Sequence, residues 1–438
     1  MAVKFDTHQW LSGYGIGAVI YGLVVAVLWS PYFTPPATIG PEGGILRADQ
    51  VLLPLVVGLI VYINFDRVNI PINHLLMGLL AVTITIAVSV TVNAVIYGGP
   101  AGISELYDLI IWIGYVGLVV AVGGNLPTET AKRALLLIVL LSGGVAVVAI
   151  LQSLNVTFAV ERIAPIYTAR EQRIIVQEPT ATTTNPNTLA KLLLPPLFFA
   201  FAQSYRHIAR DAPLQKERLI GWMALSLLFS ASIVVTGSRS GLIATVIGFC
   251  VVGAVIALGR IGQRKRRRAT ILATSLSGIV GIFLIVVVFE VGRLAYLQNP
   301  LQDNSLQTRF EIWNTAVPII LEQPLIGHGP SKAVQLDAGI VHIESGFLSW
   351  WYHYGVTGII AFAVVLGGAL KIGIEKTIDG TLFEYQPVFW GAAVAVVGWF
   401  SGSVAAWTVA GVPQSRRVFT LSLLIVALLI SSVSQEHD

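Results

Sequence analysis

A succession of long apolar runs is the feature that most constrains the fold of this 438-residue chain. A helix needs about 20 apolar residues to cross the hydrocarbon core of a bilayer, and the sequence predicts about twelve such helices. Only 11% of the residues are charged, against about 25% in soluble proteins. We therefore predict an all-α polytopic membrane protein. The predicted helices lie near residues 12–31, 49–64, 70–96, 105–124, 131–153, 187–205, 219–236, 240–260, 269–292, 343–370, 386–408 and 415–433.

Clusters of Lys and Arg orient the predicted helices, because cytoplasmic loops carry an excess of these residues. Three clusters, Lys132-Arg133, Arg206 to Arg218 and Arg264-Lys-Arg-Arg-Arg268, fall on one side in the helix count. We therefore expect this side and both termini to be cytoplasmic, with the protein in the inner membrane. The first apolar run follows Lys4 and lacks a small-residue cleavage site, so we expect it to be retained as a signal anchor.

Two long polar segments are predicted on the opposite, extracytoplasmic side. Both contain arginines, which runs against the positive-inside bias and indicates an anionic partner outside the cytoplasm. The second segment is too polar to lie in lipid, and we interpret it as the loop that carries the active site. The single integral membrane domain is then divided into N-terminal helices (1–153), an extracytoplasmic loop (154–186), central helices (187–292), the large extracytoplasmic loop (293–342) and C-terminal helices (343–438).

Two cations stand where predicted helices begin on the extracytoplasmic side. Lys191 follows Asn185-Pro-Asn187, in which either asparagine is a candidate N-cap. A lysine beside a helix N-terminus favours an anion, but its long stem also allows snorkelling to the interface. Arg239 lies in the turn Thr236-Gly-Ser-Arg239-Ser-Gly241. Its guanidinium suits phosphate oxygens, and anchoring at lipid headgroups is the alternative.

The large loop and the helix after it supply aromatic and titratable candidates. Arg309 and Trp313 are four residues apart and share a face if the segment is helical, either as a cation–π pair or as ligand contacts. His342 and Glu344 are both candidate general bases, and a first-turn charge is the alternative for Glu344. His328 and His353 are weaker candidates. The aromatic residues form either an interfacial belt or a surface that stacks on sugars; they are Trp350, Trp351, Tyr352 and Tyr354.

Several function classes lack any sequence support. The single cysteine, Cys250, lies in an apolar run, which argues against a disulfide framework or a cysteine metal site. The chain contains no H-E-x-x-H, Walker or dinucleotide motif. The net charge of +4 is small, so a role with nucleic acids is not indicated. We expect no metal and no cofactor.

Taken together, the motifs in the second half of the chain resemble those of the O-antigen ligase and polymerase superfamily, which are membrane glycosyltransferases of the bacterial envelope. Each motif is weak alone, but their order and spacing are specific. In chain order they are Asn185-Pro-Asn187-Thr-Leu-Ala190, Gly237-Ser-Arg239-Ser-Gly241, Arg309-x-x-x-Trp313, Pro324-Leu-Ile-Gly327-His-Gly329, and Glu344-Ser-Gly-Phe-Leu348 running into Gly355-x-x-Gly358.

The resemblance implies a GT-C-like fold and a glycan donor carried on polyprenyl diphosphate in the outer leaflet. An acceptor hydroxyl, on another glycan or on a lipid A core, would attack the anomeric carbon with inversion and without a metal. Trp313, Trp350, Trp351 and Tyr354 would contact the glycan. A flippase and a chain-length regulator would be partners besides membrane lipids. The diphosphate would be held by Lys191, Arg239 and Arg309 and by the loop arginines Arg162, Arg170 and Arg173.

One departure from the family pattern bears on the choice between ligase and polymerase. Ligases of the family have a histidine about three helical turns before the Gly-x-x-Gly, where many polymerases have an acidic residue. Here Glu344 stands eleven residues before Gly355, and His342 stands two residues earlier. The pattern favours a polymerase slightly, with a ligase as the alternative, and the general base stays open between Glu344 and His342.

Two other classes of function remain alternatives. About twelve helices with broken apolar runs also suit a secondary transporter of an anionic substrate. However, Phe65-Asp66-Arg67-Val68 offers only the Asp-Arg pair of the major-facilitator signature, and the predicted helices have almost no carboxylate at mid-membrane. A structural partner of the envelope machinery is the third class. Transfer of a lipid-linked glycan without nucleotide or metal would separate the enzyme from both.

Overall fold

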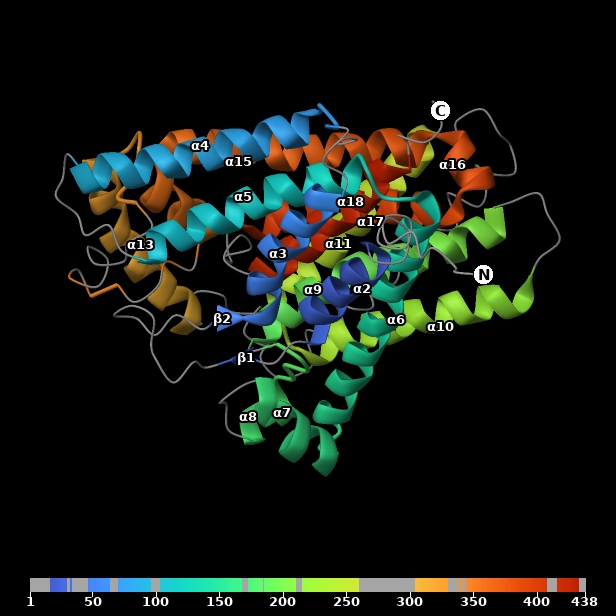
Figure 1. Cartoon of the computed structure of the whole chain (residues 1–438). Coiled ribbons are helices and arrows are strands. Elements are labelled where there is room, and N and C mark those ends of the chain that lie inside the picture. The colour runs from blue at the N-terminus through green and yellow to red at the C-terminus, as the bar shows by residue number, and fades with distance from the viewer. Residues whose placement is uncertain are drawn as a thin grey trace, which may run out of the picture.

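The computed structural model shows a bundle of helices that pack side by side (Figure 1). The residues that the structure describes are 16–29, 32–33, 46–63, 70–95, 103–167, 172–183, 185–209, 215–259, 304–329, 337, 339–340, 343, 345–407 and 416–432. The strands among these residues form one antiparallel pair of two residues each, β1 (Tyr32–Phe33) and β2 (Leu46–Arg47). The predicted helical, membrane-type architecture is confirmed.

Seven of the described helices are long and apolar enough to cross a membrane. They are α4 (His74–Val95), α5 (Ile103–Gly123), α6 (Thr128–Ser153), α10 (Lys216–Val235), α11 (Arg239–Leu258), α15 (Gly346–Ile378) and α17 (Pro387–Trp407). Four more helices complete the bundle: α2 (Ile16–Trp29), α3 (Ala48–Ile63), α9 (Pro186–Ala209) and α18 (Arg416–Ser431). Each predicted apolar segment except 269–292 coincides with one of these helices. Segment 269–292 lies outside the described residues, so twelve crossings stay a prediction.

The two ends of the bundle differ in the elements that they carry (Figure 1). At one end lies α13 (Asn304–Glu322), and we call this the α13 end. At the opposite end lies the short helix α16 (Gly380–Tyr385), held by Arg206, which donates to the carbonyl oxygens of Phe383 at 2.6 Å and Glu384 at 2.8 Å. The start of α6 lies beside α2 near Gly17, and the end of α18 lies beside the end of α5 at Gly123. The first and last described helices therefore begin and end away from α13.

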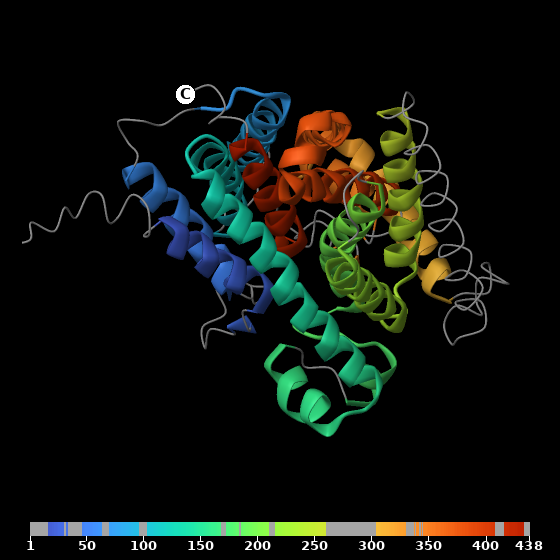
Figure 2. The same cartoon turned by 90° about the vertical axis from the view of Figure 1, so that its right-hand side faces the viewer.

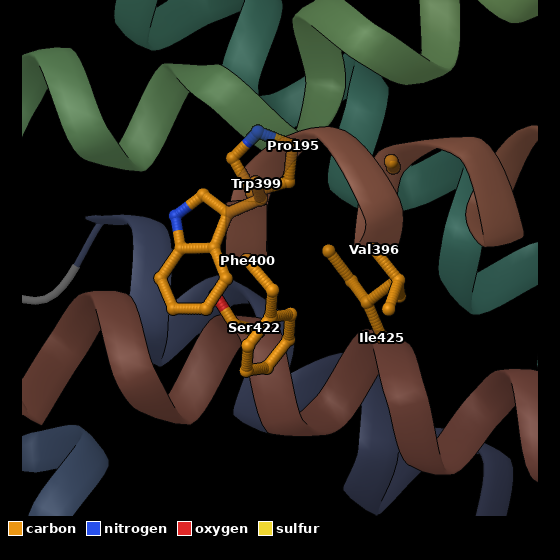
Figure 3. Close-up of a pocket in the computed structure, with 7 residues that line it drawn as sticks. Pro195, Val396, Trp399, Phe400, Ser422 and Ile425 are labelled. Atoms are coloured by element: carbon orange, nitrogen blue, oxygen red, sulfur yellow. The ribbon is translucent and has the colours of Figure 1, made fainter. Parts of the chain in front are cut away.

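Helix α9 runs through the middle of the bundle and is buried over nearly its whole length. Its side chain Phe198 packs between α11 and α17 because both helices present a glycine there, Gly248 and Gly398. A Cβ atom at Gly398 would lie 2.5 Å from the Phe198 ring. Next to Phe198, the pair Pro195-Pro196 interrupts the hydrogen bonding of α9, and a narrow space beside Pro195 is lined mainly by apolar side chains of α17 and α18, including Trp399 and Ile425 (Figure 3). This close packing fixes the position of the α9 N-terminus.

The loop predicted at 154–186 contains helices of its own. The π-helix η3 (Phe158–Ile163) and the helices α7 (Ala164–Tyr167) and α8 (Gln172–Gln177) form a cap beyond the end of α6 (Figure 2). The cap is joined to the bundle by hydrogen bonds. The Gln152 side-chain oxygen accepts from the backbone of Thr180 at 3.1 Å, and the Tyr167 hydroxyl donates to the Trp29 carbonyl at 2.9 Å.

Arg417 is a second attachment point for this cap. It lies in the first turn of α18, is 1% exposed, and donates to the backbone carbonyls of Val27 and Thr182. Thr182 in turn donates from its hydroxyl to the Leu28 carbonyl at 2.8 Å. A buried guanidinium has several donors to satisfy, and backbone carbonyls at chain turns provide acceptors for them. Arg417 thus ties α18, the end of α2 and the cap together at the α13 end.

Candidate active site

The N-termini of α9 and α11 meet at the α13 end. Asn185 caps α9, since its side-chain oxygen accepts from the backbone of Asn187 at 2.8 Å. Of the two candidate N-caps, the structure thus selects Asn185. Ser238 caps α11 by accepting from the backbone of Gly241 at 3.1 Å, and its hydroxyl also donates to the Asn187 side-chain oxygen at 2.7 Å. The motif around Asn187 and the motif around Ser238, which are distant in sequence, therefore form one surface.

A glycine makes this close approach possible. A Cβ atom at Gly241 would lie 2.5 Å from the Cβ of Ala190, so a larger residue would push the two helix starts apart. Free backbone N–H groups and the positive end of the dipole make each helix N-terminus attractive to anions. When two helix N-termini lie side by side, the attraction that each exerts on an anion adds to that of the other. Arg239 is the first residue of α11 and is half-buried at this junction.

Lys191 lies on α9 directly after Ala190 and is only 3% exposed. Among the residues that the structure describes, no hydrogen-bond acceptor or carboxylate pairs with its ammonium group. Within the described part of the chain, the charged group with an electrostatic effect on Lys191 is another cation, Arg309 of α13. A buried ammonium group near a second cation is unfavourable unless an anion offsets its charge. This burial does not fit a lysine that snorkels to the membrane interface.

Arg309 and Trp313 both belong to helix α13 and, being four residues apart, lie on one side of it. Both are half-buried. The indole N–H of Trp313 is buried and has no hydrogen-bond partner within the described part of the chain. A buried donor without a partner costs free energy, and a bound oxygen atom would relieve that cost.

The far half of α13 is fixed on the start of α15 (Figure 1). Ala316 and Ile320 are buried against Ile340, Ile343 and Tyr352 in a small apolar cluster. The His328 ring stacks on Tyr352, with centroids 4.9 Å apart, and its Nε2 donates to the Ile319 carbonyl at 2.7 Å. His328 therefore holds α13 in place, which agrees with its being a weak candidate for catalysis.

The segment Pro324 to Gly329 clamps a break in α15. Gly355 has φ +66 and ψ −168, so its peptide leaves the helical path and frees backbone groups on both sides. The backbone N–H of His328 donates to the Tyr352 carbonyl at 2.7 Å, and that of Gly329 donates to the His353 carbonyl at 3.0 Å. In the other direction, the Val356 N–H donates to the Pro324 carbonyl at 2.9 Å. The motif Pro324 to Gly329 and the motif that begins at Gly355 are therefore held together by backbone hydrogen bonds and form one structural unit, a joint between two segments of the chain.

Four aromatic residues near this break were predicted to contact glycan or form an interfacial belt. Trp350 is buried between Trp112 and Phe362, with ring centroids at 5.5 and 4.4 Å. Tyr352 is buried under His328. Trp351 is half-buried, and its indole N–H donates to the Pro324 carbonyl at 3.0 Å. Tyr354, the fourth, is buried and belongs to a polar cluster described next.

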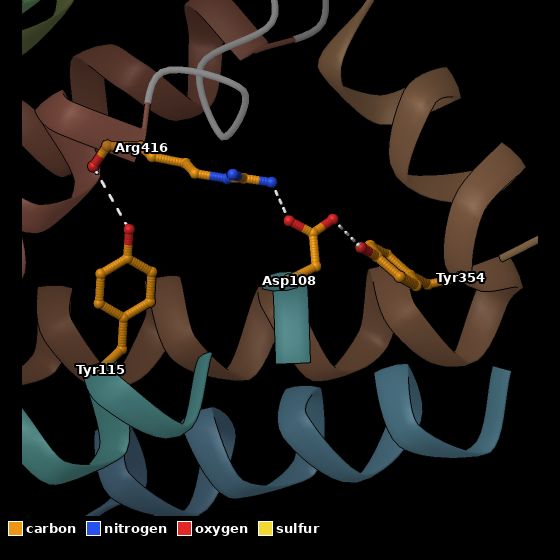
Figure 4. Close-up of polar contacts among 4 residues, drawn as sticks. All are labelled: Asp108, Tyr115, Tyr354 and Arg416. Atoms are coloured by element: carbon orange, nitrogen blue, oxygen red, sulfur yellow. Dashed lines mark hydrogen bonds and ion pairs between the residues drawn. The ribbon is translucent and has the colours of Figure 1, made fainter. Parts of the chain in front are cut away.

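An ion pair that the sequence did not single out lies between α5 and α18 (Figure 4). Arg416 forms a salt bridge with Asp108, whose other oxygen accepts from the Tyr354 hydroxyl at 3.2 Å. The Arg416 guanidinium also lies over the Tyr107 ring, 4.8 Å from its centroid. The pair connects three helices at the α13 end. An aspartate near the start of one apolar helix and an arginine at the start of another were the available signals, but nothing in the sequence pairs them.

The remaining predicted residues are placed as follows. Arg162 is exposed on η3, and Arg173 belongs to α8. Arg170 and the two candidate bases, His342 and Glu344, lie outside the described residues. Helix α15 begins at Gly346, after Ser345, whose hydroxyl accepts from the Leu348 backbone at 3.3 Å. Among the described residues, no group of three His, Cys, Asp or Glu side chains is suited to hold a metal ion.

Comparison with known proteins bears on the same part of the chain. Residues 224–363 match the family model described as O-antigen ligase. The predicted resemblance to the O-antigen ligase and polymerase superfamily is confirmed for this segment. The segment that matches the O-antigen ligase family contains Arg239, Arg309, Trp313 and the Gly355 break, whereas Lys191 precedes it.

A curated relative shows a weaker likeness. An uncharacterized protein of Haemophilus influenzae is 26% identical to this chain over 174 residues. The alignment covers 34% of this chain and 42% of the relative, so the chain spans less than half of that protein's length.

Proposed function

We propose that this protein is a membrane glycosyltransferase that polymerises or transfers a glycan carried on polyprenyl diphosphate. The observation that carries the proposal is the burial of Lys191 near Arg309 at the joined N-termini of α9 and α11, with no ion-pair or hydrogen-bond partner for its ammonium group among the described residues. Cations and helix N-termini together suit a diphosphate. The match of residues 224–363 to the O-antigen ligase family supplies the chemical class.

In the proposed reaction, an acceptor hydroxyl attacks the anomeric carbon of the donor sugar. The bond from that carbon to the diphosphate oxygen breaks, and the new glycosidic bond forms with inversion. Lys191, Arg239 and Arg309 stabilise the charge that develops on the leaving diphosphate, which is the kind of preorganised electrostatic effect that dominates many enzymes. Glu344 or His342 accepts the proton of the acceptor hydroxyl. The chemistry of these groups needs no metal.

The other predicted site residues have supporting roles in this proposal. The half-buried rings of Trp313 and Trp351 contact the glycan. Trp350 and Tyr354 are buried beside the α15 break and support it. Arg162, Arg170 and Arg173 are proposed as further diphosphate contacts contributed by the cap and its neighbouring chain. We further propose a GT-C-like arrangement in the inner membrane, with the α13 end extracytoplasmic and both termini cytoplasmic. A flippase and a chain-length regulator are the proposed partners.

Ligase and polymerase activity differ in the acceptor, so one assay with two acceptors tests the proposal. Purified protein in lipid nanodiscs is incubated with a lipid-linked oligosaccharide donor in the presence of EDTA and without nucleotide. A polymerase lengthens the glycan when donor is the only substrate. A ligase needs an added lipid A-core acceptor. If neither mixture yields a new glycosidic product, while a known ligase or polymerase does so in parallel, the proposal is wrong.

A further inference from the structure

Helix α13 presents three different sectors around its circumference. The inward sector carries Arg309 and Trp313 and packs on α15 through Ala316 and Ile320. A second sector is exposed and polar, with Glu311, Thr315 and Glu322 among its members. The third sector is exposed and apolar, and it adjoins the inward sector on the side of Trp313.

We call this third sector the apolar shoulder; it consists of Phe310, Val317 and Leu321. Val317 and Leu321 follow Phe310 by seven and eleven residues, a spacing that places all three on one face of a helix. They are 49%, 37% and 57% exposed. Leu325, just beyond α13, and Phe347, at the start of α15, are also exposed apolar side chains. A helix with an exposed apolar strip beside a polar one is typical of the boundary between lipid and water.

The arrangement fits a ligand with an anionic head and an apolar tail. Arg309 is adjacent to Phe310 in the sequence, and Lys191 lies within its electrostatic range, so cations stand beside one end of the shoulder. The carboxylates of Glu311 and Glu322 lie in the polar sector, away from the shoulder, where they disfavour an anionic head on that side. On the helix, Trp313 lies between Arg309 and the apolar shoulder. Its buried indole N–H has no hydrogen-bond partner among the described residues and offers a donor to an oxygen of the head.

We propose that the apolar shoulder of α13 binds the isoprenoid chain of the lipid-linked donor, while Arg309 and Lys191 hold its diphosphate. This inference rests on the proposed function and extends it to the tail of the substrate. The shoulder then guides the donor sideways from the outer leaflet to the cations. Apolar area buried between the shoulder and the isoprenoid chain stabilises the complex. The cations at one end of the shoulder determine that the diphosphate end of the lipid binds there.

Site-specific photo-crosslinking tests this inference. A photo-crosslinking residue is placed at Val317 or Leu321 in the full-length protein, and matched controls carry it at Thr315 or Glu322 in the polar sector. Each protein is reconstituted in phosphatidylcholine nanodiscs that contain radiolabelled undecaprenyl diphosphate, and is then illuminated. We expect label at the two shoulder positions and little at the controls. No label at the shoulder would overturn the inference.

Ordinary contact with bulk lipid is the competing explanation, and Arg309→Gln separates the two. Losing one charge-assisted contact to the diphosphate should lower the crosslinking yield roughly tenfold. A yield that stays unchanged in Arg309→Gln would show that the shoulder faces bulk lipid, and the inference would be wrong. Thermal unfolding of the variant checks that α13 stays in place.

Binding of inorganic diphosphate distinguishes failure of the inference from failure of the proposed function. The double variant Val317→Ser/Leu321→Ser should bind inorganic diphosphate as the wild type does, while its crosslinking at Phe310 falls severalfold. If the wild type binds inorganic diphosphate but is not labelled at the shoulder, the shoulder assignment alone is wrong. If the wild type binds neither, the proposed function fails as well.

Discussion

The hydroxyl of Ser238 donates a hydrogen bond of 2.7 Å to the side-chain oxygen of Asn187, and this bond joins the first turns of α11 and α9. Ser238 also caps its own helix by accepting from the Gly241 backbone. One hydroxyl thus fixes the junction of two helix N-termini at the proposed diphosphate site. Its removal should affect both stability and anion binding.

We predict that Ser238→Ala lowers the free energy of unfolding by about 1–2 kcal/mol, from loss of a cap and of a buried hydrogen bond. Binding of inorganic diphosphate should weaken severalfold. Ser226→Ala is the matched control, because the Ser226 hydroxyl donates within its own helix to the Trp222 carbonyl at 2.9 Å. Thermal unfolding in detergent and diphosphate binding are measured for both. Equal effects of the two variants would contradict the assigned role of the junction.

Lys191→Met should separate stability from function. Among the described residues no anion compensates the buried ammonium group, so an apolar side chain of similar length is expected to raise the free energy of unfolding by about 1–3 kcal/mol. Anion binding should fall at least tenfold, because a direct charged contact is lost. The exposed Lys216 provides the control variant Lys216→Met, which should change neither property. A Lys191→Met protein that is less stable and still binds diphosphate would refute this account of Lys191.

Arg239→Lys tests whether the guanidinium shape matters at the start of α11. A guanidinium can hold two phosphate oxygens at once, and an ammonium holds them only as a point charge. We expect transfer activity to fall at least tenfold in Arg239→Lys. Arg218 is exposed on α10, so Arg218→Lys should leave activity unchanged. Mild and equal losses would instead indicate that Arg239 anchors the protein at lipid headgroups.

Gly355→Ala tests the joint between α15 and the segment Pro324 to Gly329. At φ +66 an alanine is strained, and its Cβ would collide with the Leu325 carbonyl. The expected loss in the free energy of unfolding is about 2 kcal/mol or more. Gly367 lies in the same helix with open space around it, so Gly367→Ala should stabilise the helix by about 0.5–1 kcal/mol. Melting temperatures that move in the same direction would contradict the role given to Gly355.

Much of the helical framework could be predicted from the sequence, because lipid requires long apolar helices. From the sequence, Arg309 and Trp313 belonged to the large loop and shared a face only if the segment was helical; the structure supplies that helix as α13. The Asn185 cap was predicted as one of two possibilities, since a short polar side chain before a proline is typical of a helix start.

Contacts between distant segments could not be predicted in the same way. Local patterns place Asp108 and Arg416 near helix starts, but only the tertiary arrangement brings them together. The Gly327 and Gly355 motifs were recognised as family features, yet their mutual hydrogen bonding depends on how α13 folds back on α15. Trp350, a candidate for stacking on sugars, lies in an aromatic core because its neighbours come from other helices.

The choice of general base is a separate prediction. Glu344→Gln and His342→Ala are made individually, and transfer from a lipid-linked donor is measured across pH. We expect the larger loss in Glu344→Gln, because the register to Gly355 favours that residue. A loss confined to His342→Ala would assign the base to His342 and favour a ligase. Retained activity in both variants would mean that substrate positioning and electrostatic stabilisation of the leaving diphosphate suffice for transfer without a general base.

The most direct test of the central claim is glycan transfer by the double variant Lys191→Met/Arg309→Gln, compared with the wild type in nanodiscs that contain a lipid-linked donor and EDTA. We predict that the wild type forms a new glycosidic product. The double variant should be at least 100-fold slower, the loss typical when charge stabilisation of a transition state is removed, while its thermal unfolding shows that it is folded. A double variant that transfers glycan at the wild-type rate would contradict the claim that these cations hold the leaving diphosphate.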